Sequence, residues 1–359
     1  MIKYVNYSKI QLLLLNWFEE NKRDLPWRNT SNPYLIWLSE IILQQTRVAQ
    51  GLDYYLRISE RFPDVDSLAN AKEDELLKLW QGLGYYSRAR NMHSCAKQIV
   101  EKFDSVFPTE YEQIISLKGI GTYTAAAISS IAYNKPFAVV DGNVIRVLSR
   151  LFAVDEDVFN GKGKKIIENL ANELLDKINP GQFNQAMMEY GALYCVPQNP
   201  DCENCVLRKF CRAKALNKVD LLPVKKKNIE KRIRYFQYTI PVFDFEGRKS
   251  TLLVRRTQED VWKNLFQFPL FENVTAENTS AFDFHPDLKP FFQDFSIKSS
   301  RHYTHILSHQ KIEADFTIFE CFITDFSSFS EPYIIVPLNE LKMFAMPRLV
   351  DRFLVELNF

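Results

Sequence analysis

Apolar residues in the first part of the chain recur at the spacing of helices that bury one face. Ile10, Leu14 and Trp17 stand at positions i, i+4 and i+7, and comparable segments follow as far as about residue 215. Pairs such as Asn-Pro and Phe-Pro separate these segments, and no convincing alternation of apolar and polar residues occurs among them. The pattern predicts an all-α region over residues 1–216.

The pattern changes after residue 234. Two runs rich in β-forming residues, 235–245 and 250–255, stand on either side of Glu246 and Gly247, which is a hairpin signal. Further along the chain, the pattern predicts strands at 312–323 and 333–336 and helices at 339–344 and 348–357. We therefore expect an α+β domain over residues 235–359.

Residues 217–234 join these two regions. From Lys218 to Arg234 the chain carries seven Lys or Arg and only two acids. This composition favours a solvated linker, with contact to phosphate as the alternative.

The composition excludes two broad classes of protein. Of the 359 residues, 46% are hydrophobic and 14% aromatic, which is enough for a core and excludes a disordered chain. No stretch approaches the roughly 18 apolar residues that cross a membrane. The apolar run at 12–15 is too short for a secretory signal, so we expect a cytoplasmic protein. A net charge of +1 does not indicate a partner, since local patches still bind anions.

Four of the six cysteines crowd into one short segment. Cys195, Cys202, Cys205 and Cys211 have the spacing C-x6-C-x2-C-x5-C, and four thiolates at this density can surround one metal centre. Structural zinc usually uses two C-x2-C pairs, whereas this segment has one pair with unequal gaps. The spacing therefore favours an iron–sulfur cubane over zinc. Such a cluster can brace a loop and aim its basic residues at phosphate, without any role as an electron carrier.

A tight turn between two helices is expected at residues 117–128, which read LKGIGTYTAAAI. Gly119 and Gly121 permit positive φ and the close approach of another backbone. The free N–H groups of the second helix would then face outward with the positive end of its dipole, which suits a nucleic-acid phosphate. A plain turn between packed helices is the alternative.

A single carboxylate follows the apolar run at 137–140. Asp141 stands just before a helix whose apolar face includes Val144 and Val147, and its simplest role is that of a helix N-cap. A carboxylate at a helix start stays ionised, which also suits it to stabilising a nearby cation. The two roles are compatible.

Together these features resemble the helix–hairpin–helix superfamily of DNA glycosylases. The resemblance spans residues 25–215 and rests on the hairpin at 112–131, the Val-Asp about twenty residues later and the cysteine loop at 195–211. In the endonuclease-III-like branch, a lysine that forms a Schiff base stands two residues after the second hairpin glycine. Here that position is Tyr123, and a phenol cannot form an imine. The sequence is more similar to the MutY-type adenine DNA glycosylases.

The resemblance assigns roles to four residues. Glu40 lies in the motif SEIILQQT and would protonate the adenine, Asp141 would stabilise the sugar cation, and Tyr123 and Asn143 would position them. From the residues alone, an exposed helix glutamate is the alternative for Glu40. Its neighbours Ile36, Trp37 and Leu43 favour a buried carboxyl with a raised pKa.

The resemblance also implies the contacts with DNA. The expected DNA-contact residues are Arg28 in the LPWR motif, Gln44, Gln45 and Thr46 after the Glu40 helix, Leu83 and Tyr85 in a second minor-groove loop, Gly119 and Gly121 of the hairpin, and Ser308 and His309. Gln45 and Tyr85 are the side chains expected to enter the opened base stack, with core packing as the alternative for Leu83 and Tyr85.

Residues from about 235 resemble the MutT-like, Nudix-fold domain that follows MutY-type glycosylases. The glutamate-rich Nudix catalytic box is absent, so we expect no pyrophosphatase activity. The segment HILSH at 305–309 matches the part of the family that recognises 8-oxoguanine, with Ser308 bonded to the lesion.

The resemblance therefore implies a monomeric, monofunctional glycosylase with one 4Fe-4S cluster. Its substrate would be duplex DNA with adenine opposite 8-oxoguanine or guanine, which also implies association with the nucleoid. Two alternatives stay open: an endonuclease-III-like glycosylase/lyase for oxidised pyrimidines, and a non-catalytic DNA-binding or redox iron–sulfur protein.

Overall fold

The computed structural model describes residues 6–224, 231–273, 288, 291–292, 294–322 and 332–357. The chain forms two compact units, one of residues 1–70 and 91–227 and the other of residues 71–90 and 228–359. Residues 225–230 of the expected linker lie outside the described residues. Within the described part of the chain, no helix is long and apolar enough to cross a membrane.

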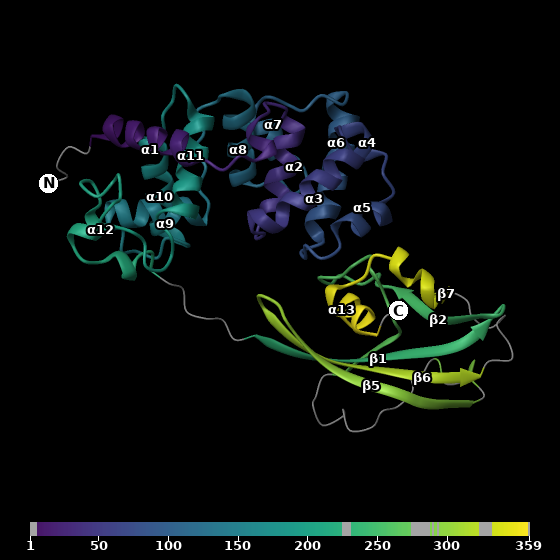
Figure 1. Cartoon of the computed structure of the whole chain (residues 1–359). Helices are drawn as coiled ribbons and strands as arrows, with labels where there is room; N and C mark the ends of the chain where they lie inside the picture. Colours follow the sequence, from purple (N-terminus) through teal and green to yellow (C-terminus); the bar gives the residue numbers. More distant parts are fainter. Residues whose placement is uncertain are drawn as a thin grey trace. The chain divides into compact units, whose positions relative to one another are not determined.

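The first unit is built from helices (Figure 1). Its elements are α1 (Tyr7–Asn21), the 3₁₀ turn η1 (Pro26–Arg28), α2 (Pro33–Leu43), α3 (Val48–Arg61), α4 (Val65–Ala69), most of α6 (Ser87–Phe103), α7 (Tyr111–Ile115), α8 (Thr122–Tyr133), α9 (Gly142–Phe152), α10 (Gly161–Leu174), α11 (Pro180–Leu193), α12 (Arg212–Ala215) and the 3₁₀ turn η2 (Val219–Leu221). The all-α character predicted for this region is confirmed.

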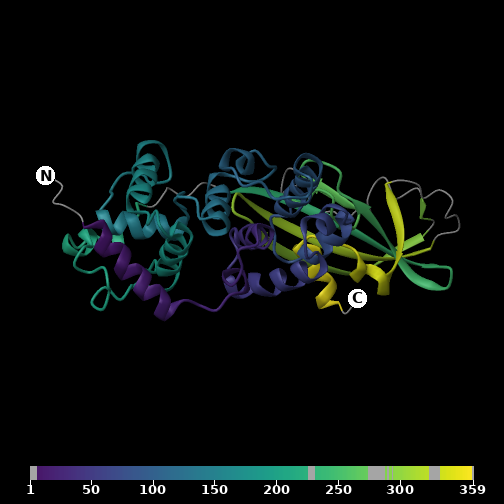
Figure 2. The ribbon, with the colours of Figure 1, turned by 90° about the horizontal axis from the view of Figure 1, so that it is seen from above.

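Helix α11 is central to the first unit because it packs against α1, α8 and α9. Figure 2 shows α1, in purple, running beside the teal helices. Trp17 of α1 meets Tyr190 of α11 edge to face, with ring centroids 4.8 Å apart. On α9 the expected apolar face is buried and includes Val144 and Val147. The core thus joins helices from both ends of this part of the sequence.

The second unit combines helices with a sheet (Figure 1). Its elements are α5 (Glu73–Trp80), β1 (Arg232–Phe245), β2 (Arg248–Arg255), β3 (Phe266–Gln267), β4 (Leu270–Asn273), β5 (Asp294–Ile306), β6 (Gln310–Phe322), β7 (Tyr333–Pro337), the 3₁₀ helix η5 (Leu338–Met343) and α13 (Arg348–Glu356). The strand order is β3-β2-β1-β6-β5, with β4 also paired to β1 and β7 to β2. Among the strand pairs of the described residues, β1 and β6 run parallel and the other pairs are antiparallel.

Several elements of the sheet follow the sequence prediction. The hairpin at Glu246 and Gly247 is confirmed, with φ of 49° and 76°, as a two-residue turn between antiparallel strands requires. Strand β5 was not predicted, because only Tyr303 in it is fully buried and no apolar alternation marks it. Helix α13 covers the sheet through Phe353, whose ring stacks on Phe316 of β6 at 4.4 Å.

Candidate active site and DNA-contact elements

Helix α2 places Glu40 inside the helical unit. The helix begins after Asn32, whose side chain accepts a hydrogen bond from the Tyr34 N–H, and Pro33 occupies the first turn. Most residues of the helix are apolar, and all of residues 36–42 are buried, so Glu40 is only 8% exposed. An exposed helix glutamate is therefore excluded.

The surroundings of Glu40 favour its protonated form. Burial raises the pKa of Glu40 from 4.5 to about 7; a hydrogen bond with Tyr123 opposes this rise, and the charge of Asp141 adds to it. The pKa shift expected from its apolar neighbours is confirmed. A carboxyl group with this pKa can donate a proton near neutral pH.

Tyr123 lies in the first turn of α8, within electrostatic range of both carboxyl groups. Its hydroxyl forms a hydrogen bond with Glu40 and lies 3.6 Å from Met188 Sδ. Burial raises the pKa of Tyr123 well above 10, and the charges of Glu40 and Asp141 raise it further. The phenol therefore stays a neutral hydrogen-bond donor beside the carboxyl groups.

Asp141 is the N-cap of α9, as the sequence indicates. Its Oδ1 accepts a hydrogen bond from the Val144 N–H at 2.7 Å, and its Oδ2 accepts one from Asn143 Nδ2 at 2.8 Å. Burial nevertheless raises the pKa of Asp141, although these bonds and the charge of Arg146 act in the opposite direction. The N-cap position therefore does not by itself keep this carboxyl group at its usual pKa.

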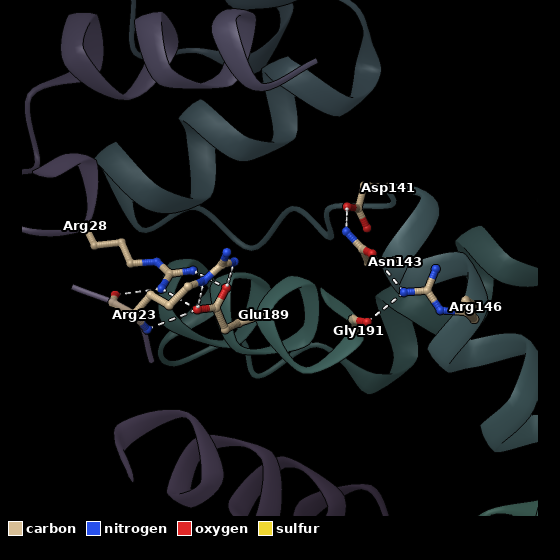
Figure 3. Close-up of polar contacts among 7 residues, drawn as sticks. All are labelled: Arg23, Arg28, Asp141, Asn143, Arg146, Glu189 and Gly191. Carbon is tan, nitrogen blue, oxygen red and sulfur yellow. Dashed lines mark hydrogen bonds and ion pairs between the residues drawn. The ribbon is translucent and has the colours of Figure 1, made fainter. Parts of the chain in front are cut away.

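Arg146 holds Asn143 in place from the next turn of α9 (Figure 3). Its Nη2 donates to Asn143 Oδ1 at 2.9 Å and to the Gly191 carbonyl at 2.7 Å, while Nε donates to the Cys195 carbonyl at 2.8 Å. A Cβ atom at Gly191 would lie 2.7 Å from the Asn143 Cβ, so α11 can approach this site only with glycine there.

The two carboxyl groups share one cavity of about 170 Å³. Its lining includes Glu40, Tyr123, Asp141 and Asn143, which come from three helices and the turn before α9. The geometry can place an acid and a second carboxyl group around one small polar ligand. This is the arrangement that acid-assisted cleavage of a glycosidic bond requires.

Helix α11 supplies a wall of the cavity that the sequence analysis missed. The wall is formed by Gln185, Met188, Glu189 and Ala192, which stand at i, i+3, i+4 and i+7. The signal available in the sequence is one polar and one acidic residue on the inward stripe of a mostly apolar helix.

Glu189 binds two arginines beside that wall (Figure 3). It is 2% exposed, and it accepts hydrogen bonds from Arg23 at 2.8 and 2.5 Å and from Arg28 at 2.9 and 2.7 Å. Burial alone would raise the pKa of Glu189, but the bonds from both guanidinium groups lower the pKa to about 2. Arg28, expected to contact DNA, lines the cavity with its guanidinium group paired to Glu189.

The hairpin between α7 and α8 leaves the N-terminus of α8 without a side-chain cap. Gly119 has a φ of +78°, and a Cβ atom there would lie 2.6 Å from the Asn91 Cβ. Gly121 has a φ of −99° and caps α8 without a side-chain hydrogen bond. The positive φ that glycine permits is thus adopted at Gly119, whereas at Gly121 extended backbone leads into the helix.

The three residues after α2 differ in their surroundings: Gln44 contacts α8, whereas Gln45 is exposed. Gln44 donates to Thr124 Oγ1 at 3.2 Å and faces α8, and the Thr46 N–H donates to the Leu43 carbonyl at 3.1 Å. Gln45 is exposed and has a φ of +56°. A turn of this kind projects Gln45 away from the helices.

The second expected DNA loop lies in the same unit as the HILSH segment. Leu83 is buried, whereas Tyr85 is 45% exposed with a φ of +48°. Ser308 and His309 are both exposed, and all four residues line one cavity of about 280 Å³. The fold therefore brings together residues more than 200 positions apart in the sequence.

The four clustered cysteines lie near the C-terminal end of α11. Burial raises the pKa of Cys211, and the other three thiols raise it further, which places all four within electrostatic range. In the part of the chain that the structure describes, no three His, Cys, Asp or Glu side chains converge on the position of one metal ion. Four thiolates are the ligand set that a 4Fe-4S cluster takes, and this loop supplies that number.

Buried side chains connect the cysteine loop to the rest of the helical unit. Arg150 of α9 donates to Cys195 Sγ at 3.5 Å, to the Val196 carbonyl at 2.7 Å and to the Pro197 carbonyl at 3.0 Å. The Tyr190 hydroxyl lies 2.9 Å from Cys205 Sγ. The loop is thus fixed to α9, whose first residues carry Asn143.

Comparison with known proteins first defines the class of this fold. Residues 38–177 match the model of the HhH-GPD superfamily of base excision DNA repair proteins, and residues 242–356 match a NUDIX domain. A thermostable thymine-DNA glycosylase is 27% identical, with a TM-score of 0.54 over 58% of this chain and 97% of that one. An endonuclease III–DNA complex, 20% identical with a TM-score of 0.51 over 60% of this chain and 99% of that one, shares the fold. The predicted fold class is confirmed, and the helical unit is that of a helix–hairpin–helix DNA glycosylase.

Curated relatives define the family more closely. The adenine DNA glycosylase of Buchnera aphidicola subsp. Acyrthosiphon pisum is 37% identical over 276 residues, which cover 76% of both chains. The adenine DNA glycosylases of Mus musculus and Homo sapiens are 44% and 42% identical over 56% of this chain, and these matches cover 41% and 38% of their own length. The chain belongs to the MutY-type family of adenine DNA glycosylases.

Proposed function

We propose that the protein hydrolyses the N-glycosidic bond of adenine paired with 8-oxoguanine or guanine in duplex DNA. Family membership supports adenine as the excised base. The observation that carries the chemistry is that Glu40 and Asp141 line one cavity and that Glu40 has a pKa of about 7. The adenine would enter this cavity after extrusion from the duplex, at a cost of a few kcal/mol.

The proposed reaction uses the two carboxyl groups in different roles. Glu40 gives its proton to a ring nitrogen of adenine, so that the base leaves as a neutral molecule when the bond to the sugar breaks. The sugar is left as an oxocarbenium cation, which the Asp141 carboxylate stabilises. Water then adds to the cation and gives its proton to the Glu40 carboxylate, which restores the acid.

The residues around the carboxyl groups support this division of roles. Tyr123 forms a hydrogen bond with Glu40, and Asn143 donates one to Asp141. Tyr123 stands where a lyase of this superfamily would have its lysine, and it cannot form a Schiff base. The reaction should therefore end at an abasic site without strand cleavage.

We also propose that Gln185 recognises the adenine edge. It lines the cavity from α11, and an amide can accept from N6 and donate to N7 of adenine at the same time. Glu189 carries one negative charge against the two positive charges of Arg23 and Arg28, so it offsets only part of the positive charge beside this wall of the cavity.

The second unit would read the opposite base. We propose that Ser308 hydrogen-bonds the edge that distinguishes 8-oxoguanine from guanine, and that His309 lies beside it. Tyr85 lines the same cavity and would fill the space left in the stack. Gln45 and Thr46 of the helical unit would also contact the opened DNA. The open N-terminus of α8 would bind a phosphate.

The cysteine loop would hold one 4Fe-4S cluster through Cys195, Cys202, Cys205 and Cys211. Proteins of this superfamily typically carry such a cluster. Bound there, it would brace the loop that Arg150 ties to α9 and orient nearby basic residues towards DNA. We further propose that the protein acts as a monomer on nucleoid DNA in the cytoplasm.

An alkali-cleavage assay on a panel of mismatched duplexes tests this proposal. Adenine opposite 8-oxoguanine or guanine should yield alkali-labile sites, and the strand should stay intact without alkali. Cleavage of a thymine-glycol duplex without alkali would instead identify an endonuclease-III-like lyase. Absence of labile sites from every duplex would indicate a DNA-binding protein without glycosylase activity.

A further inference from the structure

Helix α5 and the loop after it belong to the same unit as the sheet. At the start of α5, Asn264 Nδ2 donates to Glu73 Oε1 at 2.6 Å, and Arg255 forms a bidentate ion pair with Asp74 at 2.8 and 2.5 Å. Asn264 has a φ of +66°, so a turn in the left-handed region presents its amide to α5. The first turn of α5 is thus attached to the β2–β3 side of the unit.

The far end of α5 is attached to α13. Gln81, the residue that ends α5, donates from Nε2 to Asp351 Oδ1 at 2.6 Å. Lys78 donates to Gln81 Oε1 at 2.8 Å and to the Phe344 carbonyl at 3.2 Å. The amide of Gln81 therefore has both of its ends fixed, one of them by a carboxylate of the C-terminal helix.

Residues 82–85, which we call the wedge loop, begin immediately after Gln81. Gly82, Gly84 and Tyr85 all have positive φ, at 98°, 74° and 48°. The Gly84 carbonyl accepts from Trp80 Nε1 at 3.1 Å, and the loop ends at Tyr86, whose hydroxyl donates to the Met346 carbonyl at 3.2 Å. A short loop with three left-handed residues keeps one shape only if both of its ends are held.

The anchors on the two sides of the wedge loop both lie in the segment that leads into and forms α13. Met346 lies two residues before the first residue of this helix, and Asp351 lies in its first turn. The helix itself is held by its apolar face, on which Leu349, Val350, Phe353 and Leu354 are at most 5% exposed. Removal of the Asp351 carboxylate should therefore remove one anchor of the Gln81 side chain without undocking the helix.

We propose that Asp351 is a positioning residue for base extrusion, acting through Gln81 on the wedge loop. The C-terminal domain thus sets the direction in which Tyr85 projects, in addition to carrying Ser308. The inference rests on the proposed function, because it requires Tyr85 to fill the space of an extruded adenine.

The consequence is specific to substrates that need extrusion. When the Asp351 anchor is lost, the wedge loop occupies its productive conformation for a smaller fraction of the time, so the extruded state of a paired adenine becomes less populated. An adenine that is already unpaired does not need the wedge. Loss of this hydrogen bond to a charged group should lower the excision rate on a paired duplex roughly tenfold.

The test compares Asp351→Ala, Gln81→Ala and the double variant in the full chain. Single-turnover excision is measured on adenine opposite 8-oxoguanine and on adenine placed in a single-base bulge, and 2-aminopurine fluorescence at the target position reports extrusion. Asp351→Asn keeps an acceptor for Gln81 and should restore the rate. Glu340→Ala, which removes a surface ion pair with Arg248 in the same unit, is the matched control.

We expect both single variants to slow excision and reduce extrusion for the paired substrate only, with the double variant no worse than either. Equal rates for the variants and the wild type would overturn the inference, as would equal losses on both substrates, which indicate a structural defect. Failure of the wild-type protein to release adenine from either substrate would instead refute the proposed function.

Discussion

Replacement of Glu40 by glutamine should make the protein more stable and inactive at the same time. Folding transfers this carboxyl group from water to a buried site, where its pKa rises from 4.5 to about 7. The difference corresponds to a cost of about 3 kcal/mol for keeping the carboxylate charged in the folded state at high pH. Glutamine has a similar shape and carries no charge to desolvate, so it avoids this cost.

The sign of the effect follows from proton binding. Because the folded state holds the Glu40 proton more tightly than the unfolded state, the free energy of unfolding falls as the pH rises from about 4.5 to about 7. The stability gained through Glu40→Gln should therefore be about 3 kcal/mol at about pH 8 and about 1 kcal/mol at about pH 5.

Urea denaturation followed by far-ultraviolet circular dichroism measures this difference, because the signal reports mainly the helical unit. Transition midpoints of the variant and the wild type are compared at both pH values. Glu112→Gln, at an exposed position of α7, is the matched control and should shift neither midpoint. The reasoning would be refuted by a stabilisation that does not depend on pH, or by near-normal adenine excision in the Glu40 variant.

Three further outcomes follow from the site. Asp141→Asn should lower the excision rate at least roughly 100-fold while duplex binding in a gel-shift assay stays largely intact, and near-normal excision would contradict its role. The wild-type excision rate should fall as the pH rises through about 7, because Glu40 must be protonated to act. A single-turnover rate that stays constant between about pH 6 and about pH 8 would exclude Glu40 as the acid. Ser308→Ala should reduce the preference for 8-oxoguanine over guanine opposite adenine by roughly 5- to 10-fold in competition binding, and an unchanged preference would reject this contact.

The sequence was informative wherever a residue's environment is set by its own segment. The apolar run of α2 predicts that Glu40 is buried with a raised pKa, and the turn sequence Glu246-Gly247 predicts the hairpin between β1 and β2. Asp141 could be recognised as an N-cap for the same reason, since its partner is the N–H three residues later. Resemblance to a family, rather than periodicity, pointed to the pairing of Glu40 with Asp141.

Other features depend on which surfaces meet, and these were decided by the tertiary structure. Glu189 pairs with Arg23 and Arg28 across more than 160 residues of sequence, and no local pattern announces that contact. Burial outweighs the N-cap hydrogen bonds at Asp141, because the surrounding helices exclude water from it.

The sequence by itself determined the helical and mixed regions, the cysteine spacing and the identity of the acidic residues, because periodicity and turn chemistry act over a few neighbouring positions. Only the tertiary structure decided that residues 71–90 pack with the sheet, that Gln81 meets Asp351 and that Tyr85 shares a cavity with Ser308. Such pairings arise from the complementarity of whole surfaces once the chain has folded, and hydrophobic patterning records that a face is buried without recording which partner buries it.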